Sequence, residues 1–201
     1  MLRNKTLWLF LLKAALLYGL LSAPVPAFDK AYGDFYRGLA KKVFGKFRET
    51  GFVIFSEMKD PAMTHTNLGN YKVPKPDGSF DTAAIDINTR ILGYLPTILL
   101  ISLVIASPVG FRRKMIALAL GIFLTMLLIL FKHWISLIWL AQQTPWLQLA
   151  NYTGWKLSVL TFTNTFISSS SFTVAYFVIA IWLLVTFRME DLKSFIQPVK
   201  K

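Results

Sequence analysis

The sequence contains no cysteine among its 201 residues. Disulfide bonds, thiolate zinc sites, iron–sulfur clusters and cysteine nucleophiles are therefore excluded. Histidine is nearly absent as well, since only His65 and His133 occur. A zinc site would need carboxylates from scattered loops around these two side chains, so we expect no metal site and no other cofactor.

Familiar catalytic motifs are also missing, because no P-loop, GxGxxG, HExxH or GxSxG pattern occurs. Acidic residues are few, with 10 against 22 basic ones and a net charge of +12. No RNP-like or zinc-finger signature accompanies this excess, so nucleic acid is not an expected partner. Anionic lipid headgroups attract basic residues that flank apolar runs, as do Arg3, Lys5, Arg112, Arg113, Lys114, Arg188, Lys193, Lys200 and Lys201.

Charge is absent from two long runs, 91–111 and 115–131, which lie on either side of Arg112-Arg113-Lys114. Each run is long enough, or nearly so, to cross a hydrocarbon layer of about 30 Å as a helix rising about 1.5 Å per residue. Short loops rich in Lys and Arg stay in the cytoplasm, so the triplet predicts a tight cytoplasmic turn of a membrane hairpin. A hydrophobic content of 55% is typical of a membrane protein.

Residues 1–27 read as a signal anchor or first transmembrane helix, with a cleaved signal peptide as the alternative. Lys13 costs roughly 3 kcal/mol at a membrane centre, but the surrounding leucines at about −0.5 kcal/mol each outweigh it. Residues 91–201 then hold the hairpin, an outer loop, a last transmembrane helix and a short cytoplasmic tail. The expected fold is an all-α polytopic protein of the bacterial inner membrane with about four transmembrane helices.

Residues 28–90 differ from the rest, because they hold eight of the ten acidic residues with short apolar groups between them. We expect a small α+β extracytoplasmic segment between the first two transmembrane helices. Aromatic residues at a spacing near 3.6 predict an amphipathic helix over 28–49, and strands are predicted at 52–55, 71–73 and 79–88. The expected partner or membrane interface comprises Tyr32, Phe35, Tyr36, Phe47, Arg90, Trp146 and Trp155.

Lys132-His133 is the sharpest chemical feature of the predicted spans. Charge within an apolar helix commonly faces a protein interior or water and marks a functional site. The alternative is that the span ends at Phe131 and both side chains extend to the outer headgroups as anchors. The sequence favours this second interpretation.

The serine run Ser168, Ser169, Ser170 and Ser171 is placed by the topology at the same outer level as Lys132. A serine beside a neutral lysine is a workable nucleophile–base pair. Hydroxyl groups between helices, or at a helix start, are the commoner interpretation. Arg90 is expected to anchor the interface, by pairing with Asp86 if that stretch is helical or by meeting phosphate headgroups.

The order of Arg112-Arg113-Lys114, a long span carrying Lys132, an outer loop and a last span with a basic tail resembles the C-terminal core of the exosortase/archaeosortase family over roughly residues 91–188. The resemblance implies a polytopic membrane transpeptidase that processes C-terminal sorting signals. That family needs a cysteine nucleophile with an arginine and a histidine. Here cysteine is absent, Lys132 stands near the place of the arginine, and the last span has no histidine. The resemblance therefore implies a non-catalytic relative or an accessory protein.

The function that the sequence favours is a non-enzymatic interaction or assembly subunit of a cell-envelope export or sorting system. Its expected partners are the lipid bilayer and either another envelope protein or a second copy of itself. One alternative is a membrane-embedded hydrolase or exosortase-like transpeptidase relative that acts at the outer face through Lys132, His133 and the serine run. A transporter or channel subunit is the other alternative.

Overall fold

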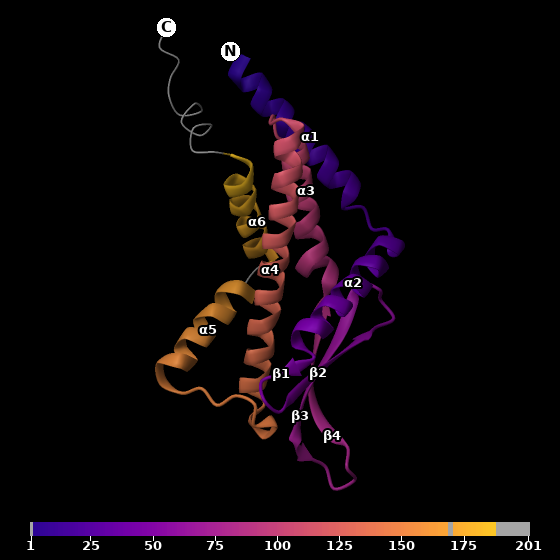
Figure 1. The fold of residues 1–201 in the computed structure, drawn as a ribbon, viewed down its shortest axis with the longest axis vertical. Coiled ribbons are helices and arrows are strands. Elements are labelled where there is room, and N and C mark those ends of the chain that lie inside the picture. The colour runs from indigo at the N-terminus through magenta and orange to yellow at the C-terminus, as the bar shows by residue number, and fades with distance from the viewer. Residues whose placement is uncertain (1, 169–170, 188–201) are drawn as a thin grey trace. The chain divides into compact units, whose positions relative to one another are not determined.

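The computed structural model describes residues 2–168 and 171–187, which form two compact units (Figure 1). The helical unit takes the described residues of Met1–Ala23, Leu95–Leu127 and Val174–Lys201. The sheet unit takes those of Pro24–Tyr94 and Leu128–Thr173. The segment expected at 28–90 thus forms its compact unit together with residues from the second half of the chain.

The sheet unit contains four antiparallel strands in the order β1-β2-β3-β4. Helix α2 (Pro26–Phe44) precedes β1 (Lys46–Phe47), β2 (Gly51–Glu57), β3 (Met63–Pro74) and β4 (Phe80–Asn88). The π-helical turn η1 (Arg90–Tyr94) follows, and the end of α4 (Phe111–Gln143), the 3-10 turn η2 (Pro145–Leu147) and α5 (Gly154–Ser168) complete the unit. The strands predicted at 52–55 and 71–73 lie in β2 and β3, and the strand predicted at 79–88 matches β4 except that β4 begins one residue later. The predicted helix ends earlier, at Phe44, because the chain turns at Gly45 into β1.

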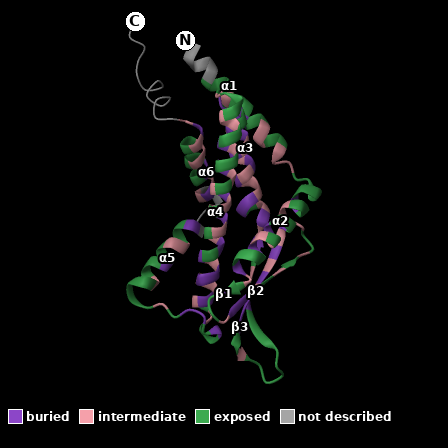
Figure 2. Ribbon diagram, in the orientation of Figure 1, coloured by how far each residue is buried: buried purple, intermediate pink, exposed green. Residues whose placement is uncertain are grey.

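The period-two pattern of β3 gives the sheet an inner face, because alternate residues from Thr64 to Asn70 are buried. Leu68 pairs with Val53 on one side and Ala83 on the other, and all three side chains are buried. Figure 2 shows buried residues recurring along the strands and exposed residues at the β3–β4 turn.

Helix α2 buries Tyr36, Ala40 and Phe44, which are four residues apart and therefore lie on one helical face. Contacts of α2 with β2 and β3 show that this face meets the sheet.

Three aromatic rings pack against one another on the outer face of the sheet, near the turn that joins β3 to β4. The ring of Phe52 lies 4.6 Å from that of Tyr71 and 5.8 Å from that of Phe80, measured between centroids. A Cβ atom at Gly69 would collide with the Phe52 ring, so the missing side chain makes room for the aromatic ring across the strand pair.

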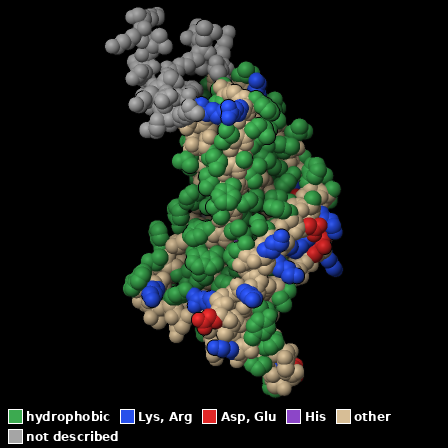
Figure 3. Space-filling view, viewed as in Figure 1, with side chains coloured by type: hydrophobic (Ala, Val, Ile, Leu, Met, Phe, Trp, Pro, Cys, Tyr) green, Lys and Arg blue, Asp and Glu red, His purple; other side chains and the backbone are tan. Residues whose placement is uncertain are grey.

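The helical unit is formed by α1 (Leu2–Leu21), α3 (Leu95–Ala106), the first part of α4 and α6 (Ser171–Thr186). The ring of Phe10 stacks on Trp182 at 5.4 Å, and the Trp182 indole N–H donates to the Ser107 hydroxyl at 2.9 Å. Figure 3 shows hydrophobic side chains covering most of the visible face of these helices.

The expectation of about four transmembrane helices is wrong. Among the described residues, one helix, α4 with 33 residues, is long and apolar enough to cross a membrane. Two helices that meet at a bend, Leu7–Leu21 and Pro26–Phe44, are together long and apolar enough to cross a membrane only if they are taken as one broken span. The remaining apolar helices, Arg90–Ala106 and Thr173–Thr186, are shorter.

The physical reason for this correction is that an apolar run does not guarantee a continuous helix of the same length. The run 91–111 begins inside the π-helical turn, which continues directly into the 12 residues of α3, and the combined helix Arg90–Ala106 ends before the run does. Pro108 follows closely, and a proline disfavours helical geometry in the residue before it. At about 1.5 Å per residue, the helix from Arg90 to Ala106 reaches about 25 Å, which is short of a hydrocarbon layer of about 30 Å.

Candidate functional site

A buried hydrogen bond joins Tyr36 of α2 to His133 of α4 inside the sheet unit. The Tyr36 hydroxyl oxygen and the His133 Nδ1 atom are 2.9 Å apart. The two side chains are 2% and 1% exposed. His133 is thus a core residue. The sequence favoured a side chain that extends to the headgroup surface, and for His133 this interpretation is wrong.

Aromatic rings enclose the His133 imidazole on several sides. The ring centroids of Phe44, Phe55 and Tyr36 lie 5.1, 5.5 and 5.9 Å from that of His133. Burial raises the pKa of the Tyr36 phenol, and the neighbouring Tyr32 raises it further, so this hydroxyl keeps its proton. A protonated phenol satisfies both groups by donating to His133 Nδ1, which assigns the imidazole proton to Nε2.

The His133 Nε2 atom is buried and has no hydrogen-bond partner in the part of the chain that the structure describes. Buried polar atoms are nearly always paired, so an exception calls for an explanation. His133 also lines an open groove of about 210 Å³. The other lining residues are Asp86, Ile87, Asn88, Ile91, Leu92, Lys132 and Ser136.

Lys132 is half-buried at this groove and makes no ion pair with any residue that the structure describes. The Ser136 hydroxyl donates to the Lys132 carbonyl at 3.1 Å, one helical turn back along α4. The Asp86 carboxylate accepts from His65 Nδ1 at 2.6 Å and pairs with it across the β3–β4 ladder. The groove is therefore lined by a lysine without an ion-pair partner and by a histidine whose buried Nε2–H has no acceptor among the described residues.

The serine run was a nucleophile only in the alternative interpretation, whereas the sequence favoured hydroxyl groups that pack between helices or start one. Ser168 is the last residue of α5 and Ser171 the first of α6, while Ser169 and Ser170 lie outside the described residues. Ser136, four residues after Lys132, is a described serine that lines the groove. The i, i+4 spacing on a helix was the signal in the sequence that identifies this neighbour.

The predicted interface residues are divided between surface and interior. Phe35, Trp146 and Trp155 are exposed, at 54%, 47% and 72%. Tyr36 and Phe47 are buried inside the sheet unit, so their side chains are not available to an external partner. Tyr32 is partly buried, with its ring edge-on to that of Tyr94 at 5.6 Å.

Arg90 pairs with Asp29 of α2 and not with Asp86, because Asp86 lies in a strand and bonds to His65. The Arg90 Nη1 atom donates to both carboxylate oxygens of Asp29, at 2.6 and 2.7 Å. Asp29 is 9% exposed, and the guanidinium carbon also lies 5.6 Å from the centroid of the Tyr94 ring. This pair fastens the first turn of α2 to the start of η1.

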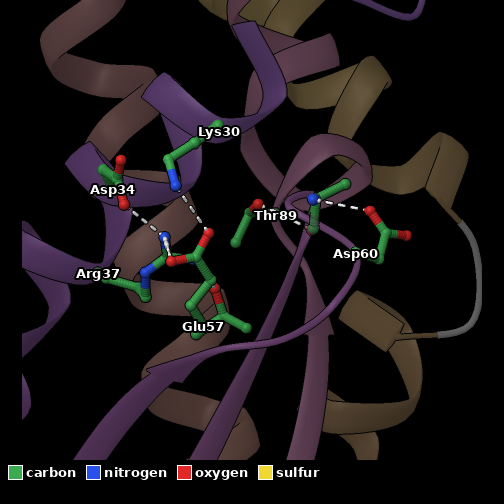
Figure 4. Close-up of polar contacts among 8 residues, drawn as sticks. Lys30, Asp34, Arg37, Glu57, Asp60 and Thr89 are labelled. Carbon is green, nitrogen blue, oxygen red and sulfur yellow. Dashed lines mark hydrogen bonds and ion pairs between the residues drawn. The ribbon is translucent and has the colours of Figure 1, made fainter. Parts of the chain in front are cut away.

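A second ionic group ties the same helix to the end of β2 (Figure 4). Arg37 of α2 contacts Asp34 at 2.5 Å and Glu57 at 3.9 Å, and Lys30 contacts Glu57 at 3.3 Å. Arg37 also donates to the Thr64 hydroxyl at 3.4 Å. Because every charge in this group has a partner, we assign it a structural role.

A larger polar depression of about 600 Å³ lies where the β1–β2 turn meets the loop after η2. Arg48 and Gln148 line it, and both have the left-handed backbone conformation, with φ of 56° and 54°. Arg48 donates to the Tyr152 hydroxyl and lies over its ring. Each left-handed residue closes a tight turn, so the local geometry follows from the turns themselves.

No group of three or more side chains able to hold a metal ion occurs among residues 2–168 and 171–187. No protein-family model, curated protein or solved structure matches the chain.

The buried phenol predicts an alkaline loss of stability. Unfolded tyrosine ionises near pH 10, whereas the folded protein resists ionisation of Tyr36 because its pKa is raised. Stability is therefore fully present below about pH 10 and falls above it, by up to about 1.4 kcal/mol per pH unit from this group. We expect Tyr36→Phe to remove that slope and Tyr71→Phe, which changes an exposed phenol, to retain it. Hydrogen exchange of the β3 amides at rising pH measures the slopes, and equal slopes in the two variants would refute the assignment.

Proposed function

We propose that this chain is a membrane-anchored, non-enzymatic interaction subunit of the bacterial cell envelope, held in the inner membrane by its helical unit. The observation that carries this proposal is the exposed apolar surface of that unit. Trp8, Leu20 and Phe111 are 70%, 74% and 79% exposed. Further side chains at least 50% exposed on α1 and α4 are Leu7, Leu9, Leu12, Leu16, Met115, Ile116, Leu120 and Phe123.

Soluble monomers rarely expose contiguous apolar patches beyond a few hundred Å², so a surface of this kind is expected to meet lipid or protein. Helix α4 supplies the spanning element, and its residues 115–131 carry no charge. Arg112-Arg113-Lys114 stands at one end of this stretch and favours a cytoplasmic position. Residues beyond 131 on the same helix are then extracytoplasmic.

Two features of the sheet unit support an interaction role: its ion pairs join α2 to neighbouring elements, and two large aromatic side chains stay exposed. The Asp29–Arg90 pair and the Arg37 group join α2 to η1 and to the end of β2. Phe35 and Trp146 remain exposed on it, and large aromatic side chains are enriched where proteins bind one another.

Membrane attachment is tested by substitution within the apolar part of α4. We expect the wild-type chain to stay in the membrane pellet after alkaline carbonate extraction. Leu120→Glu with Phe123→Glu places two charges on the exposed face of the span, at roughly 3 kcal/mol each, and is expected to release the protein. Thr82→Glu with Ala84→Glu, on exposed positions of β4, is the matched control and leaves the pellet unchanged. A wild-type chain that extracts into the supernatant would rule out the anchor.

The interaction itself is tested by a photo-reactive amino acid at Phe35 or Trp146, introduced one at a time into the full chain in its own cells. A discrete crosslinked product at either position supports the role. Absence of any product from both positions, in protein that stays in the membrane pellet, would remove it.

A second candidate function is peptide hydrolysis or transfer at the groove. One observation favours it: Ser136 and Lys132 line the same groove, one helical turn apart. Labelling by a fluorophosphonate probe that Ser136→Ala abolishes would support this function, and unlabelled wild-type protein would eliminate it.

A further inference from the structure

We infer that the groove beside β4 binds an extended peptide segment that adds as a strand to the free edge of β4 and places an acidic side chain on Lys132. This inference rests on the proposed interaction role and names the kind of segment that the partner supplies. The groove would recognise two features of the peptide, namely its backbone in strand conformation and one carboxylate side chain.

Strand β4 is the last in the strand order β1-β2-β3-β4 and therefore lies at an edge of the sheet. It pairs with β3, and no other strand pairs with it among the described residues. An edge strand presents a row of free backbone N–H and C=O groups, to which an extended peptide binds by β-augmentation. Residues 83–88 stay in continuous register with β3, because the irregularity between Gly69 and Pro74 falls at the other end of the ladder.

Proteins guard free edges with charges, prolines or bulges, and over 83–88 β4 has no proline, no bulge and one charged residue, Asp86. Its acidic residues are engaged by side chains of the same sheet unit. Asp81 pairs with Lys75 at 2.7 Å and Asp86 pairs with His65 at 2.6 Å. No described strand occupies this edge, and neither acidic side chain of these two pairs is left without a partner on it.

The groove supplies the charge preference. An ammonium group that is partly withdrawn from water is costly unless an anion pairs with it, and Lys132 has no such partner in the described chain. The buried Nε2–H of His133 is a second donor without an acceptor. A carboxylate accepts a hydrogen bond and carries the negative charge that pairs with the Lys132 ammonium group, whereas an amide oxygen accepts without a charge and an ammonium group does neither.

Asp86 does not neutralise Lys132, although both residues line the groove. Asp86 pairs across the ladder with His65, and their neighbours Thr64 and Ile87 are the residues buried on the inner face. Side chains alternate between the two faces of a sheet, so the Asp86 carboxylate points to the outer face.

The absence of cysteine permits a sharp test, because Ile91→Cys creates a single thiol at the groove. Strand-forming peptides of alternating Thr and Val, with a terminal thiol and Glu, Gln or Lys at one position, are equilibrated with the detergent-solubilised full chain in graded reductant. Intact-protein mass spectrometry measures the fraction of mixed disulfide. Tethering raises the effective concentration, so weak binding becomes measurable.

We expect the Glu peptide to withstand about tenfold more reductant than the Gln peptide, and the Lys peptide to withstand least. Lys132→Gln is expected to abolish the preference for Glu and Lys132→Arg to keep it. A thiol at Val159→Cys, an exposed position of α5, is the matched control and shows no preference.

Strand addition is tested separately from charge by N-methylation of alternate peptide amides. In an antiparallel ladder alternate residues face the neighbouring strand, so one set of methylated amides blocks binding and the set shifted by one residue does not. Equal effects of the two sets would overturn strand addition. A preference for the Glu peptide that survives Lys132→Gln would overturn carboxylate recognition by Lys132. Displacement of the Glu peptide and of the Gln peptide by the same concentration of inorganic phosphate would overturn it as well.

Failure of this inference and failure of the proposed function are distinguishable. Crosslinking at Phe35 or Trp146 with no peptide preference at Ile91→Cys leaves the interaction role and rejects the groove. Hydrogen exchange of β3 verifies that Lys132→Gln folds. If Lys132→Gln does not fold, the Glu and Gln peptides are compared on Lys132→Arg, and loss of the preference for Glu there would overturn carboxylate recognition.

Discussion

Removing either partner of the Asp29–Arg90 pair is expected to destabilise the sheet unit by about 3–5 kcal/mol. The pair is largely buried, with side chains 11% and 17% exposed, and its two hydrogen bonds join α2 to η1. Asp29→Ala leaves the Arg90 guanidinium without its carboxylate, and Arg90→Ala leaves a carboxylate in an enclosed site. Hydrogen exchange of the β3 amides in detergent solution, before and after each substitution, gives the loss.

The double variant separates a lost attraction from an orphaned charge. Because neither charge remains, Asp29→Ala with Arg90→Ala is expected to lose less stability than the sum of the single variants. The exposed pair Lys30–Glu57, with side chains 59% and 44% exposed, is the matched control, and Lys30→Ala is expected to cost less than about 1 kcal/mol. Additive losses in the double variant, or equal losses at the two pairs, would contradict a buried role for Arg90.

The second large effect is expected at His133. His133→Ala removes a ring that Phe44, Phe55 and Tyr36 enclose and leaves the Tyr36 hydroxyl without an acceptor. We expect a loss of about 3–5 kcal/mol, as for other buried aromatic side chains replaced by alanine. Tyr36→Phe keeps the ring and removes only the donor, so its expected cost is about 1–3 kcal/mol.

The chain provides its own control, because its other histidine lies on the open face of the sheet. His65 has a side chain 36% exposed and bonds to Asp86, so His65→Ala is expected to cost less than about 1 kcal/mol. Unfolding free energies measured by urea titration with near-UV circular dichroism compare the two histidines directly. A loss at His65 as large as that at His133 would contradict the assignment of His133 to the core.

Patterns between near neighbours in the sequence were sufficient to place most helices and strands. The aromatic spacing over 28–49 identified α2, and short apolar groups between turn residues identified parts of β2, β3 and β4. Lys132-His133 was also recognised as unusual, since charge beside an apolar helix is rare. These signals are local, because helical and strand periodicity depends on residues a few positions apart.

The role of each buried polar group was beyond the reach of such patterns. His133 meets Tyr36 from 97 positions away, and Arg90 meets Asp29 from 61 positions away. Nothing in the local sequence distinguishes these partners from other tyrosines and acidic residues of the same segment. The choice is made when α2, η1 and α4 come together, because a buried donor or charge is stabilised by whichever group lies within bonding distance.

The sequence by itself determined where the chain avoids water, where its charges gather and that no thiol chemistry is available to it. Only the tertiary structure decided that the helix within the apolar run 91–111 ends at Ala106, that α4 alone among the described helices clearly has the length and apolarity to span a bilayer, and that the described residues of 128–173 fold with 24–94. The physical reason is the same in each case. Hydrophobicity is a property of single side chains, whereas helix continuity and burial depend on backbone geometry and on contacts between distant segments.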